Sequence, residues 1–479
     1  MLEANNRIPA AVTRIHLIAI CGTAMGALAC MLKALGYQVT GSDRHVYPPM
    51  SRFLAQKGIA VMPGFDAAHL DYRPDLVVIG NAVTRDNPEA VATDQMGLAY
   101  CSMPQAVNRF AAAGKRQLLV AGTHGKTTTS SILAWILFSA GRDPSFIIGG
   151  ILSNFESNYR SGGGDCIVIE ADEYDTAFFD KLPKFRHYRP HATVLTSVEF
   201  DHADIYRDLD HVRSAFGEMI AAIPPDSLLV RVDDDPNVTE LVQRASCRQV
   251  AYGMRPDSGW RLGEVAVEPP FTRFQIVKNG ADFMMVHSRV IGIHNLKNTL
   301  AAVAVADSLQ IPPDRIREAL ATFTGVRRRQ EIRGQKNGVI VMDDFAHHPT
   351  AVKATLLAVK KHFYGARIVA VFEPRTHSSM RRVFQRDYAG AFDAADRVLI
   401  RKPSMLSKVP PSERFSSQQL VADLEQRGRA ATHHDDTESI IADLAASSTD
   451  GDVILIMSNG GFDNIHERLL DAMGSAEET

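Results

Sequence analysis

The sequence predicts an α/β protein of three domains, and three observations support this prediction. At 479 residues the chain is too long for one hydrophobic core and should divide into two to four domains. Short apolar strands alternate with helical segments along the chain, an order typical of parallel sheets covered by helices. This alternation is interrupted near 111–114 and 325–331. We therefore expect domains at 1–112, 113–324 and 325–479.

The composition argues against several classes of protein. An apolar fraction of 45% and a charged fraction of 22% are ordinary for a soluble globular protein. The formal net charge of −3 gives no electrostatic reason to expect nucleic acid as a partner. The five cysteines are scattered without a C-x-x-C pair, which favours reduced thiols over disulfides or a zinc site. Without a secretory leader pattern or an apolar run of about 18 residues, we expect a cytoplasmic protein with no membrane contact. No feature indicates an obligate protein partner.

The first predicted domain is Rossmann-like. A strand at Arg14–Ile20, a Gly-containing turn, a helix and a second strand ending at Asp43 follow the order of a dinucleotide or nucleotide-sugar site. If Gly22 is the middle glycine of the G-x-G-x-x-G pattern, Ile20 and Met25 occupy the other two glycine positions. This broken pattern leaves three alternatives, which are an NAD site, a site for a diphosphate-bearing substrate, and a doubly wound domain without a ligand.

A third strand of this domain, Asp75–Gly80, leads into the polar segment 81–89. Open α/β sheets bind ligands at the carboxyl ends of their strands, so this segment is a candidate ligand loop. The alternative is a solvated connection.

The second predicted domain begins with a phosphate-binding loop. The apolar strand Leu118–Ala121 passes into GTHGKT at 122–127, and a helix follows over Thr128–Phe138. In such a loop, backbone N–H groups and the helix N-terminus face the phosphates, Lys126 adds charge, and the Thr127 hydroxyl can ligate Mg²⁺. The usual spacing would place its first glycine at Val120, so a Gly-rich turn is the alternative.

Two acidic clusters follow strands of the same domain. EADEYD at 170–175 ends the strand Cys166–Ala171, and EFDHAD at 199–204 follows the strand Thr193–Ser197. Both lie at the strand ends that carry the phosphate loop, where a carboxylate and an imidazole can hold Mg²⁺ against a triphosphate. The alternatives are helix caps and an ordinary loop histidine. Antiparallel strands are expected over Val250–Gln275.

Two further segments could complete a nucleotide site. HNLKN at 294–298 precedes an Ala-rich helix, and its polar side chains could cap that helix or meet a base. The run at 327–329 is three consecutive arginines, which either form a solvated face or clamp a γ-phosphate at the domain junction. The third domain repeats the Rossmann-like order, with strands expected at 338–344, 367–372, 397–400 and 453–457.

Taken together, these motifs resemble the Mur ligase family, the ATP-dependent amide ligases of bacterial cell-wall precursor synthesis. The resemblance covers essentially the whole chain and rests on GTHGKTTT (122–129), EADEYD, EFDHAD, HNLKN, GVRRR (325–329) and DDFAHHPT (343–350). It implies a central ATPase-like domain of the phosphate-loop type, and its HGKTTT, DDxxHHPT and GxxRR forms are similar to the branch that acts on UDP-N-acetylmuramate.

Other segments are similar to the members that accept the tripeptide L-alanyl-γ-D-glutamyl-meso-diaminopimelate in murein recycling. These segments are CGTAMGALA (21–29), GSDRHVYPPMS (41–51), FFDKLPKFRHYRP (178–190), EPRT (373–376) and MSNGGFDNIH (457–466). The alternative keeps the chemistry and takes L-alanine as the amine, as in de novo peptidoglycan synthesis. The 178–190 insertion and the loop at Gly460 and Gly461 favour the roomier amine site.

The resemblance implies that ATP and Mg²⁺ are required and that both substrates are small molecules. Lys126 would bind the β- and γ-phosphates, Arg328 or Arg327 would reach the γ-phosphate, and Asp344 would meet the ribose. Thr127 with Glu170 would ligate one Mg²⁺, and His202 the second. The rest of the ATP site would be Gly122, Thr123, His124, Gly125, Thr128, His294 and Asn295. The UDP substrate would meet Gly22, Thr23, Ala24, Met25, Ser42, Asp43, Asn81 and Ala82, and the peptide would meet His347, His348 and Arg375.

The sequence departs from the family pattern in two places. Some Mur ligases hold the second metal with a carbamylated lysine, but no lysine occurs between Lys184 and Lys278, so that device is absent here. EPRTHSSM at 373–380 differs from the EPRSNTMK expected of the tripeptide members, which leaves the detailed peptide contacts open. Two other classes of protein are alternatives, an NAD-dependent oxidoreductase and a non-catalytic nucleotide-binding regulator. The first is disfavoured by the broken glycine pattern, and the second would not need both acids and His202.

Overall fold

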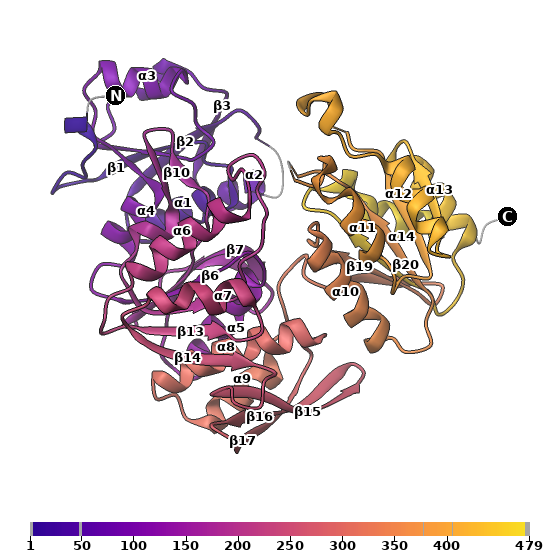
Figure 1. Cartoon of the computed structure of the whole chain (residues 1–479). Coiled ribbons are helices and arrows are strands. Elements are labelled where there is room, and N and C mark those ends of the chain that lie inside the picture. The colour runs from indigo at the N-terminus through magenta and orange to yellow at the C-terminus, as the bar shows by residue number, and fades with distance from the viewer. Residues whose placement is uncertain (1–2, 47–49, 377, 405, 475–479) are drawn as a thin grey trace.

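The computed structural model describes residues 3–46, 50–376, 378–404 and 406–474. It confirms the predicted α/β class, with one sheet of five or more strands in each of the three predicted ranges. Figure 1 shows the first two domains stacked on one another, with the orange-to-yellow C-terminal domain beside them. Residues 47–49 of the GSDRHVYPPMS motif and residue 377 of EPRTHSSM lie outside the described residues.

The N-terminal sheet is parallel and five-stranded, in the order β3-β2-β1-β4-β5. Because β1 lies between β2 and β4, the segments that follow these three strands meet at one edge of the sheet. The strands are β1 (Arg14–Ile18), β2 (Gln38–Asp43), β3 (Ala60–Pro63), β4 (Leu76–Ile79) and β5 (Tyr100–Ser102). The helices are α1 (Thr23–Ala34), α2 (Met50–Gln56), α3 (Pro88–Gln95) and α4 (Met103–Ala106).

The central sheet has ten strands, in the order β17-β16-β15-β14-β13-β12-β6-β9-β7-β8. Its parallel part places β6 between β12 and β9, so the phosphate loop and both acidic clusters emerge side by side. The strands are β6 (Arg116–Ala121), β7 (Ser145–Leu152), β8 (Ser157–Arg160), β9 (Cys166–Glu170), β12 (Pro190–Leu195), β13 (Leu228–Val232), β14 (Arg248–Gly253), β15 (Trp260–Glu268), β16 (Phe271–Lys278) and β17 (Ala281–Ser288). The helices are α5 (Lys126–Ser139), α6 (Leu209–Ala221), α7 (Pro236–Leu241), α8 (Ile293–Ser308) and α9 (Pro313–Thr322).

The antiparallel segment predicted at 250–275 is present in part. β15, β16 and β17 pair antiparallel, but β14 is parallel to β13 and continues the doubly wound sheet. Periodicity alone does not distinguish a parallel from an antiparallel partner for a short strand, so the sequence pattern does not separate β14 from the antiparallel strands. A small separate hairpin, β10 (Asp175–Ala177) with β11 (Asp180–Pro183), was not predicted.

The C-terminal sheet has six strands, in the order β18-β19-β23-β20-β21-β22. Only its edge strand β18 is antiparallel to its neighbour. The strands are β18 (Glu331–Lys336), β19 (Val339–Asp344), β20 (Ile368–Phe372), β21 (Arg397–Arg401), β22 (Ala430–His434) and β23 (Val453–Met457). The helices are α10 (Pro349–His362), α11 (Gln385–Ala391), α12 (Ser417–Gln426), α13 (Thr437–Ser447) and α14 (Ile465–Gly474).

The hydrophobic cores do not follow the three sheets one to one. A single buried cluster runs from the N-terminal strands and α1 through the whole central domain to Val326. The C-terminal domain has two clusters of its own, one on each face of its sheet. The first two domains are therefore packed as one body, and the third is attached to it. Within the described residues, none of the helices combines the length and the apolar character needed to cross a bilayer.

Candidate active site

A cleft of about 1880 Å³ lies where the three domains meet, and residues of all three line it. It brings together most of the residues singled out from the sequence. Those lining it are Gly22, Thr23, Met25, Asp43, Asn81, Ala82, Thr123, His124, Gly125, Lys126, Thr127, Thr128, Glu170, His202, His294, Asn295, Arg327, Arg328, Asp344, His347, His348 and Arg375. Of the predicted set, Gly122, Ala24 and Ser42 are not among the lining residues.

The phosphate loop depends on two glycines with positive φ. Gly122 has φ +128° and Gly125 has φ +81°, a region of backbone conformation that favours glycine. A Cβ at Gly125 would also lie 2.5 Å from the Asn298 Oδ1 atom, and one at Gly122 would lie 2.2 Å from the Thr196 Oγ1 atom. The loop therefore packs tightly enough that no other residue fits at either position.

Lys126 is the first residue of α5, and its ammonium group is held by a partner that the sequence analysis did not name. Its Nζ lies 2.9 Å from Glu173 Oε2 and 3.1 Å from Oε1, and it donates to the Gly122 carbonyl at 2.6 Å. Burial alone would lower the pKa of Lys126, but the Glu173 carboxylate raises it above its ordinary value. Lys126 therefore stays charged, in an ion pair with Glu173 beside the phosphate loop.

His202 belongs to the same chain of contacts. Its Nε2 lies 3.1 Å from Glu173 Oε1, and its Nδ1 lies 2.8 Å from the Tyr174 hydroxyl. Burial would lower the pKa of His202, and the hydrogen bond with Glu173 outweighs it and raises the pKa. Because both ring nitrogens are engaged, His202 must exchange one of these bonds before it can ligate a metal.

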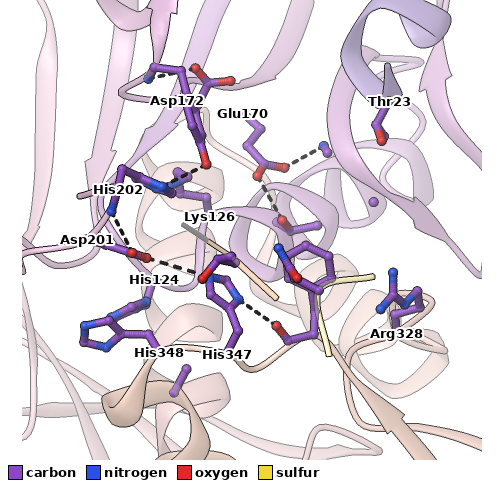
Figure 2. Close-up of a pocket in the computed structure, with 18 of the residues that line it drawn as sticks. Thr23, His124, Lys126, Glu170, Asp172, Asp201, His202, Arg328, His347 and His348 are labelled. Atoms are coloured by element: carbon purple, nitrogen blue, oxygen red, sulfur yellow. Dashed lines mark hydrogen bonds and ion pairs between the residues drawn. The ribbon is translucent and has the colours of Figure 1, made fainter. Parts of the chain in front are cut away.

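Thr127 and Glu170 lie in contact at the base of the loop. The Thr127 hydroxyl donates to Glu170 Oε1 at 2.9 Å, and the Gly149 N–H donates to Oε2 at 2.7 Å. Figure 2 shows Glu170 tethered on both sides by these two hydrogen bonds. A hydroxyl and a carboxylate are the hard oxygen donors that Mg²⁺ prefers, so this pair fits one such ion.

The three arginines of the junction point to different places. The Arg329 guanidinium donates to Thr127 Oγ1 at 3.3 Å, and its burial lowers the pKa of Arg329 from its ordinary value. Arg328 instead donates to the carbonyl oxygens of Ser458 and Gly460, both at 2.6 Å. The Arg327 N–H donates to the Ile151 carbonyl at 2.9 Å. Arg329 therefore contacts the phosphate loop directly, and a role for Arg328 or Arg327 at the γ-phosphate stays a prediction.

The segment expected to hold the adenosine is tied to the same junction. Asn295 Nδ2 donates to Gln330 Oε1 at 3.0 Å, and Asn298 donates to Asn295 Oδ1 at 3.1 Å. Asp344 accepts from the Gln330 N–H at 2.8 Å, and its burial raises its pKa. Burial lowers the pKa of His294 to about 4, so this imidazole is neutral near pH 7. Base and ribose contacts for these residues remain predictions.

The residues of the N-terminal domain predicted to bind the UDP substrate do not all face the cleft. Gly22 is the N-cap of α1, and Asp43 Oδ2 accepts from the Cys21 N–H at 2.9 Å, so this turn is fixed to the end of β2. Ser42 points the other way, into the domain, where its hydroxyl bonds the fully buried Glu89. Because successive side chains of a strand point in opposite directions, Ser42 of β2 faces the interior of the domain and not the cleft.

The C-terminal domain supplies the opposite wall. His347 Nε2 lies 3.7 Å from Asp201 Oδ2, and His348 Nε2 lies 3.2 Å from the Phe200 carbonyl oxygen. Arg375 lies along Gly460, where an added Cβ would come within 2.4 Å of the arginine Cδ. Position 460 therefore has no room for a side chain, because the arginine passes over it.

The 178–190 insertion has a different place from the one expected. None of its described residues lines the cleft. Phe178 and Phe179 pack against the core of the N-terminal domain, and the Phe179 ring meets Tyr100 edge to face with centroids 5.0 Å apart. The insertion therefore widens the contact between the first two domains and does not itself enlarge the amine pocket.

Several site residues were not named from the sequence. Glu173, Tyr174 and Asp201 lie inside the acidic clusters that were identified, but their individual partners depend on how two strand ends face each other. Glu199 accepts from Thr350 of the C-terminal domain at 2.7 Å. In the sequence, the high density of acidic residues indicates where the site lies. It does not indicate which residue each acid pairs with.

Fold and site together define a nucleotide-binding α/β protein whose phosphate loop faces an interdomain cleft. Residues 14–115 match the Mur ligase family catalytic domain, residues 120–306 the Mur ligase middle domain, and residues 328–460 the Mur ligase glutamate ligase domain. These matches cover most of the sequence in the expected order. The chain belongs to the Mur ligase family.

Three relatives refine this assignment. The chain is 39% identical over 467 residues to the UDP-N-acetylmuramate–L-alanyl-γ-D-glutamyl-meso-2,6-diaminoheptandioate ligase of Escherichia coli (strain K12), covering 97% of this chain and 99% of the relative. A murein peptide ligase structure from Psychrobacter arcticus is 34% identical with a TM-score of 0.73, covering 97% and 99%. The UDP-N-acetylmuramate–alanine ligase structure from Thermotoga maritima is 26% identical with a TM-score of 0.80, covering 97% and 99%.

Proposed function

We propose that this protein joins UDP-N-acetylmuramate to the tripeptide L-alanyl-γ-D-glutamyl-meso-diaminopimelate at the expense of ATP, in the recycling of murein. The observation that carries the proposal is the 39% identity to the Escherichia coli ligase of that specificity over almost the full length of both chains. Enzymes of this family use ATP, and the phosphate loop at the centre of the cleft is suited to bind it.

The proposed reaction has two steps. A carboxylate oxygen of the muramyl lactyl group attacks the γ-phosphorus of ATP, so an acyl phosphate forms and ADP leaves. The free α-amine of the peptide then attacks the acyl carbon, loses a proton, and expels inorganic phosphate. A free carboxylate is a poor acyl donor, and the first step supplies the leaving group. The protein contributes mainly positioning and charge neutralisation.

Lys126 and Arg329 are the cations placed to neutralise the phosphates. The Glu173 carboxylate holds the Lys126 Nζ at 2.9 Å, so the ammonium is pre-positioned at the loop. Arg329 reaches Thr127 from the junction with the C-terminal domain. Lys126 thus belongs to the central domain and Arg329 to the junction. This division supports a phosphate site that is complete only when the third domain is docked.

The residues present fit a Mg²⁺ ion at one position. Thr127 and Glu170 lie 2.9 Å apart and offer a hydroxyl and a carboxylate oxygen. Such an ion, when bound, would offset charge on the β- and γ-phosphate oxygens. A second ion at His202 would require this imidazole to give up Glu173 or Tyr174.

Amine-dependent phosphate release tests this function directly. The full chain is incubated with ATP, Mg²⁺ and UDP-N-acetylmuramate, and either the tripeptide or L-alanine is added. We expect phosphate release that requires both substrates, an amide product by mass spectrometry, and a kcat/KM at least about 10²-fold higher for the tripeptide. Lys126→Ala serves as the inactive control.

Two results would contradict the proposal at different levels. Phosphate release with L-alanine but not with the tripeptide would change the amine substrate that we propose and leave the proposed reaction unchanged. That alternative draws support from the TM-score of 0.80 to the Thermotoga maritima alanine ligase. No amine-dependent release with either compound would overturn the ligase assignment to this chain.

A further inference from the structure

Three side chains from separate segments converge beside the phosphate loop without an assigned role as a group. They are His124 of the loop, Glu199 after β12, and His348 at the start of α10, and we call them the His–Glu–His cluster. One ligand atom from each lies within 4.8 Å of the other two. The two imidazole centroids are 4.8 Å apart, and Figure 2 shows both rings next to one another.

Hydrogen bonding fixes the tautomer of His348. Its Nε2 lies 3.2 Å from the Phe200 carbonyl oxygen, which can only accept, so Nε2 carries the hydrogen. Its Nδ1 accepts a long bond from the Thr350 N–H at 3.3 Å and therefore has a lone pair. This nitrogen also lies 3.7 Å from Glu199 Oε2, and a cation bound between the two would take the place of the Thr350 N–H on the lone pair.

The donor set indicates which cation. Two imidazole nitrogens and one carboxylate oxygen form the His₂Glu set of open zinc sites, with water as a fourth ligand. Tetrahedral Zn²⁺ with bonds of about 2.0–2.1 Å spaces its ligands about 3.3 Å apart. His124 Nε2 lies 3.3 Å and His348 Nδ1 lies 3.7 Å from Glu199 Oε2, so both imidazole nitrogens are near this spacing from the carboxylate oxygen. Mg²⁺ prefers oxygen donors and fits this cluster poorly.

The surroundings of the cluster resemble an outer ligand shell. The Thr350 hydroxyl donates to Glu199 Oε2 at 2.7 Å, and the Phe200 carbonyl orients the His348 ring. Such partners fix the tautomer and the angle of the ligands. They come from the central and the C-terminal domains, as the ligands do.

We propose that the His–Glu–His cluster binds one Zn²⁺ ion, which fastens the C-terminal domain to the phosphate loop. His124 and Glu199 belong to the central domain, and His348 belongs to the C-terminal domain. An ion with ligands on both sides binds the docked arrangement and not the undocked one, so it shifts the population towards docking. This site is separate from the oxygen pair Thr127 and Glu170, and the proposal does not depend on which amine the enzyme uses.

Metal binding by the chelator-treated full chain tests the site without any substrate. Zn²⁺ is titrated by calorimetry, and Co²⁺ is used as a visible probe of four-coordinate geometry, both in excess Mg²⁺. We expect one Zn²⁺ site and a four-coordinate Co²⁺ spectrum in the native protein. Glu199→Gln and His348→Gln should weaken this binding at least about 100-fold, and Thr350→Val about 10–100-fold.

His347→Gln is the matched control, because it removes the neighbouring imidazole and leaves the cluster intact. It should bind Zn²⁺ like the native protein, and circular dichroism of each variant checks folding. Equal affinity in native protein and His348→Gln, or a six-coordinate Co²⁺ spectrum, would overturn the site. For the fastening, a fluorescent pair placed on the central and C-terminal domains should shorten its distance with Zn²⁺, and not in Glu199→Gln. An unchanged distance in the zinc-bound native protein would overturn that part.

Discussion

The two junctions between domains differ in the kind of contact that holds them together. Where the N-terminal and central domains meet, α1 packs against β7 and β8 and one hydrophobic cluster continues across the boundary. Where the central and C-terminal domains meet, several hydrogen bonds accompany one smaller apolar contact, in which Phe200 packs against the C-terminal core beside Phe384. Ser378 accepts from the Ala203 N–H at 3.1 Å, the Thr350 hydroxyl donates to Glu199, and the Arg329 guanidinium donates to Thr127.

This difference separates what must be rigid from what can move. Separating the first two domains would expose apolar surface, at about 25 cal/mol per Å². Separating the third exposes groups that water can satisfy, so docking and undocking are the default expectation there. The linker between them includes Arg328 at φ +62° and Gln330 at φ +51°, so the chain turns sharply where it leaves the central domain. We infer that the UDP substrate binds to the first two domains, which form one fixed unit. ATP reacts in the cleft that the third domain closes.

Lys126→Ala should give the largest effect and separate these two units. Removing a charge that faces the phosphates should lower kcat by at least about 10²–10³-fold. Binding of UDP-N-acetylmuramate should stay within about 2-fold, because its predicted site lies in the N-terminal domain. Calorimetry of the UDP substrate beside single-turnover kinetics measures both. A parallel loss of binding and turnover would contradict the division between the two units.

Glu173→Gln should have the next largest effect, a loss of about 10–100-fold in kcat. The amide keeps the shape but removes the charge that holds Lys126 and orients His202, so the ammonium is no longer pre-positioned. Asp175→Asn is a matched control within the same acidic cluster, because Asp175 pairs with the exposed Lys181. A kcat for Glu173→Gln equal to that of the control would contradict the positioning role.

The same variant predicts a pH dependence of stability. The pKa of Glu173 is lowered from 4.5 to about 2, because Lys126 and the hydrogen bond with His202 outweigh its burial. A carboxylate with a lowered pKa contributes stability above the unfolded pKa and loses it as the pH falls through the folded one. The difference in unfolding free energy between native protein and Glu173→Gln should therefore shrink from pH 5 towards about pH 2. Urea unfolding at several pH values measures it, and a constant difference would contradict the assignment.

The parts that the sequence predicts well are local ones. The strand β6, the turn at Gly122 and the helix α5 follow from apolar runs and glycine placement over a few residues, and the structure has them within two or three residues of the predicted bounds. The pairing of Lys126 with Glu173 could not be predicted, because it depends on two strand ends that are 47 residues apart meeting at one edge. The direction of each arginine at 327–329 depends on the left-handed backbone at Arg328, which a run of identical residues does not reveal.

Phe179→Ala tests the apolar junction and should cost about 1–2 kcal/mol of unfolding free energy, because the half-buried ring loses its contact with Tyr100. Phe283→Ala removes a comparable edge-to-face partner of Trp260 inside the central domain and is the control. Calorimetric unfolding should stay a single transition for the first two domains in the control and broaden in Phe179→Ala. Equal broadening in both variants would argue against a special role of the insertion at this junction.

Ser378→Ala should give the smallest effect and tests the polar junction. The Ser378 hydroxyl accepts from the Ala203 N–H across the two domains, whereas the buried Ser227 hydroxyl donates to the Pro190 carbonyl inside the central domain. Each hydrogen bond is worth about 0.5–1.5 kcal/mol. In Ser227→Ala this energy should appear as lower unfolding free energy. In Ser378→Ala it should appear as a larger undocked population, seen as a longer fluorescence distance between the central and C-terminal domains. If Ser378→Ala lowers global stability as much as Ser227→Ala and leaves that distance unchanged, the third domain is as firmly fixed as the first, and the contrast between the two junctions fails.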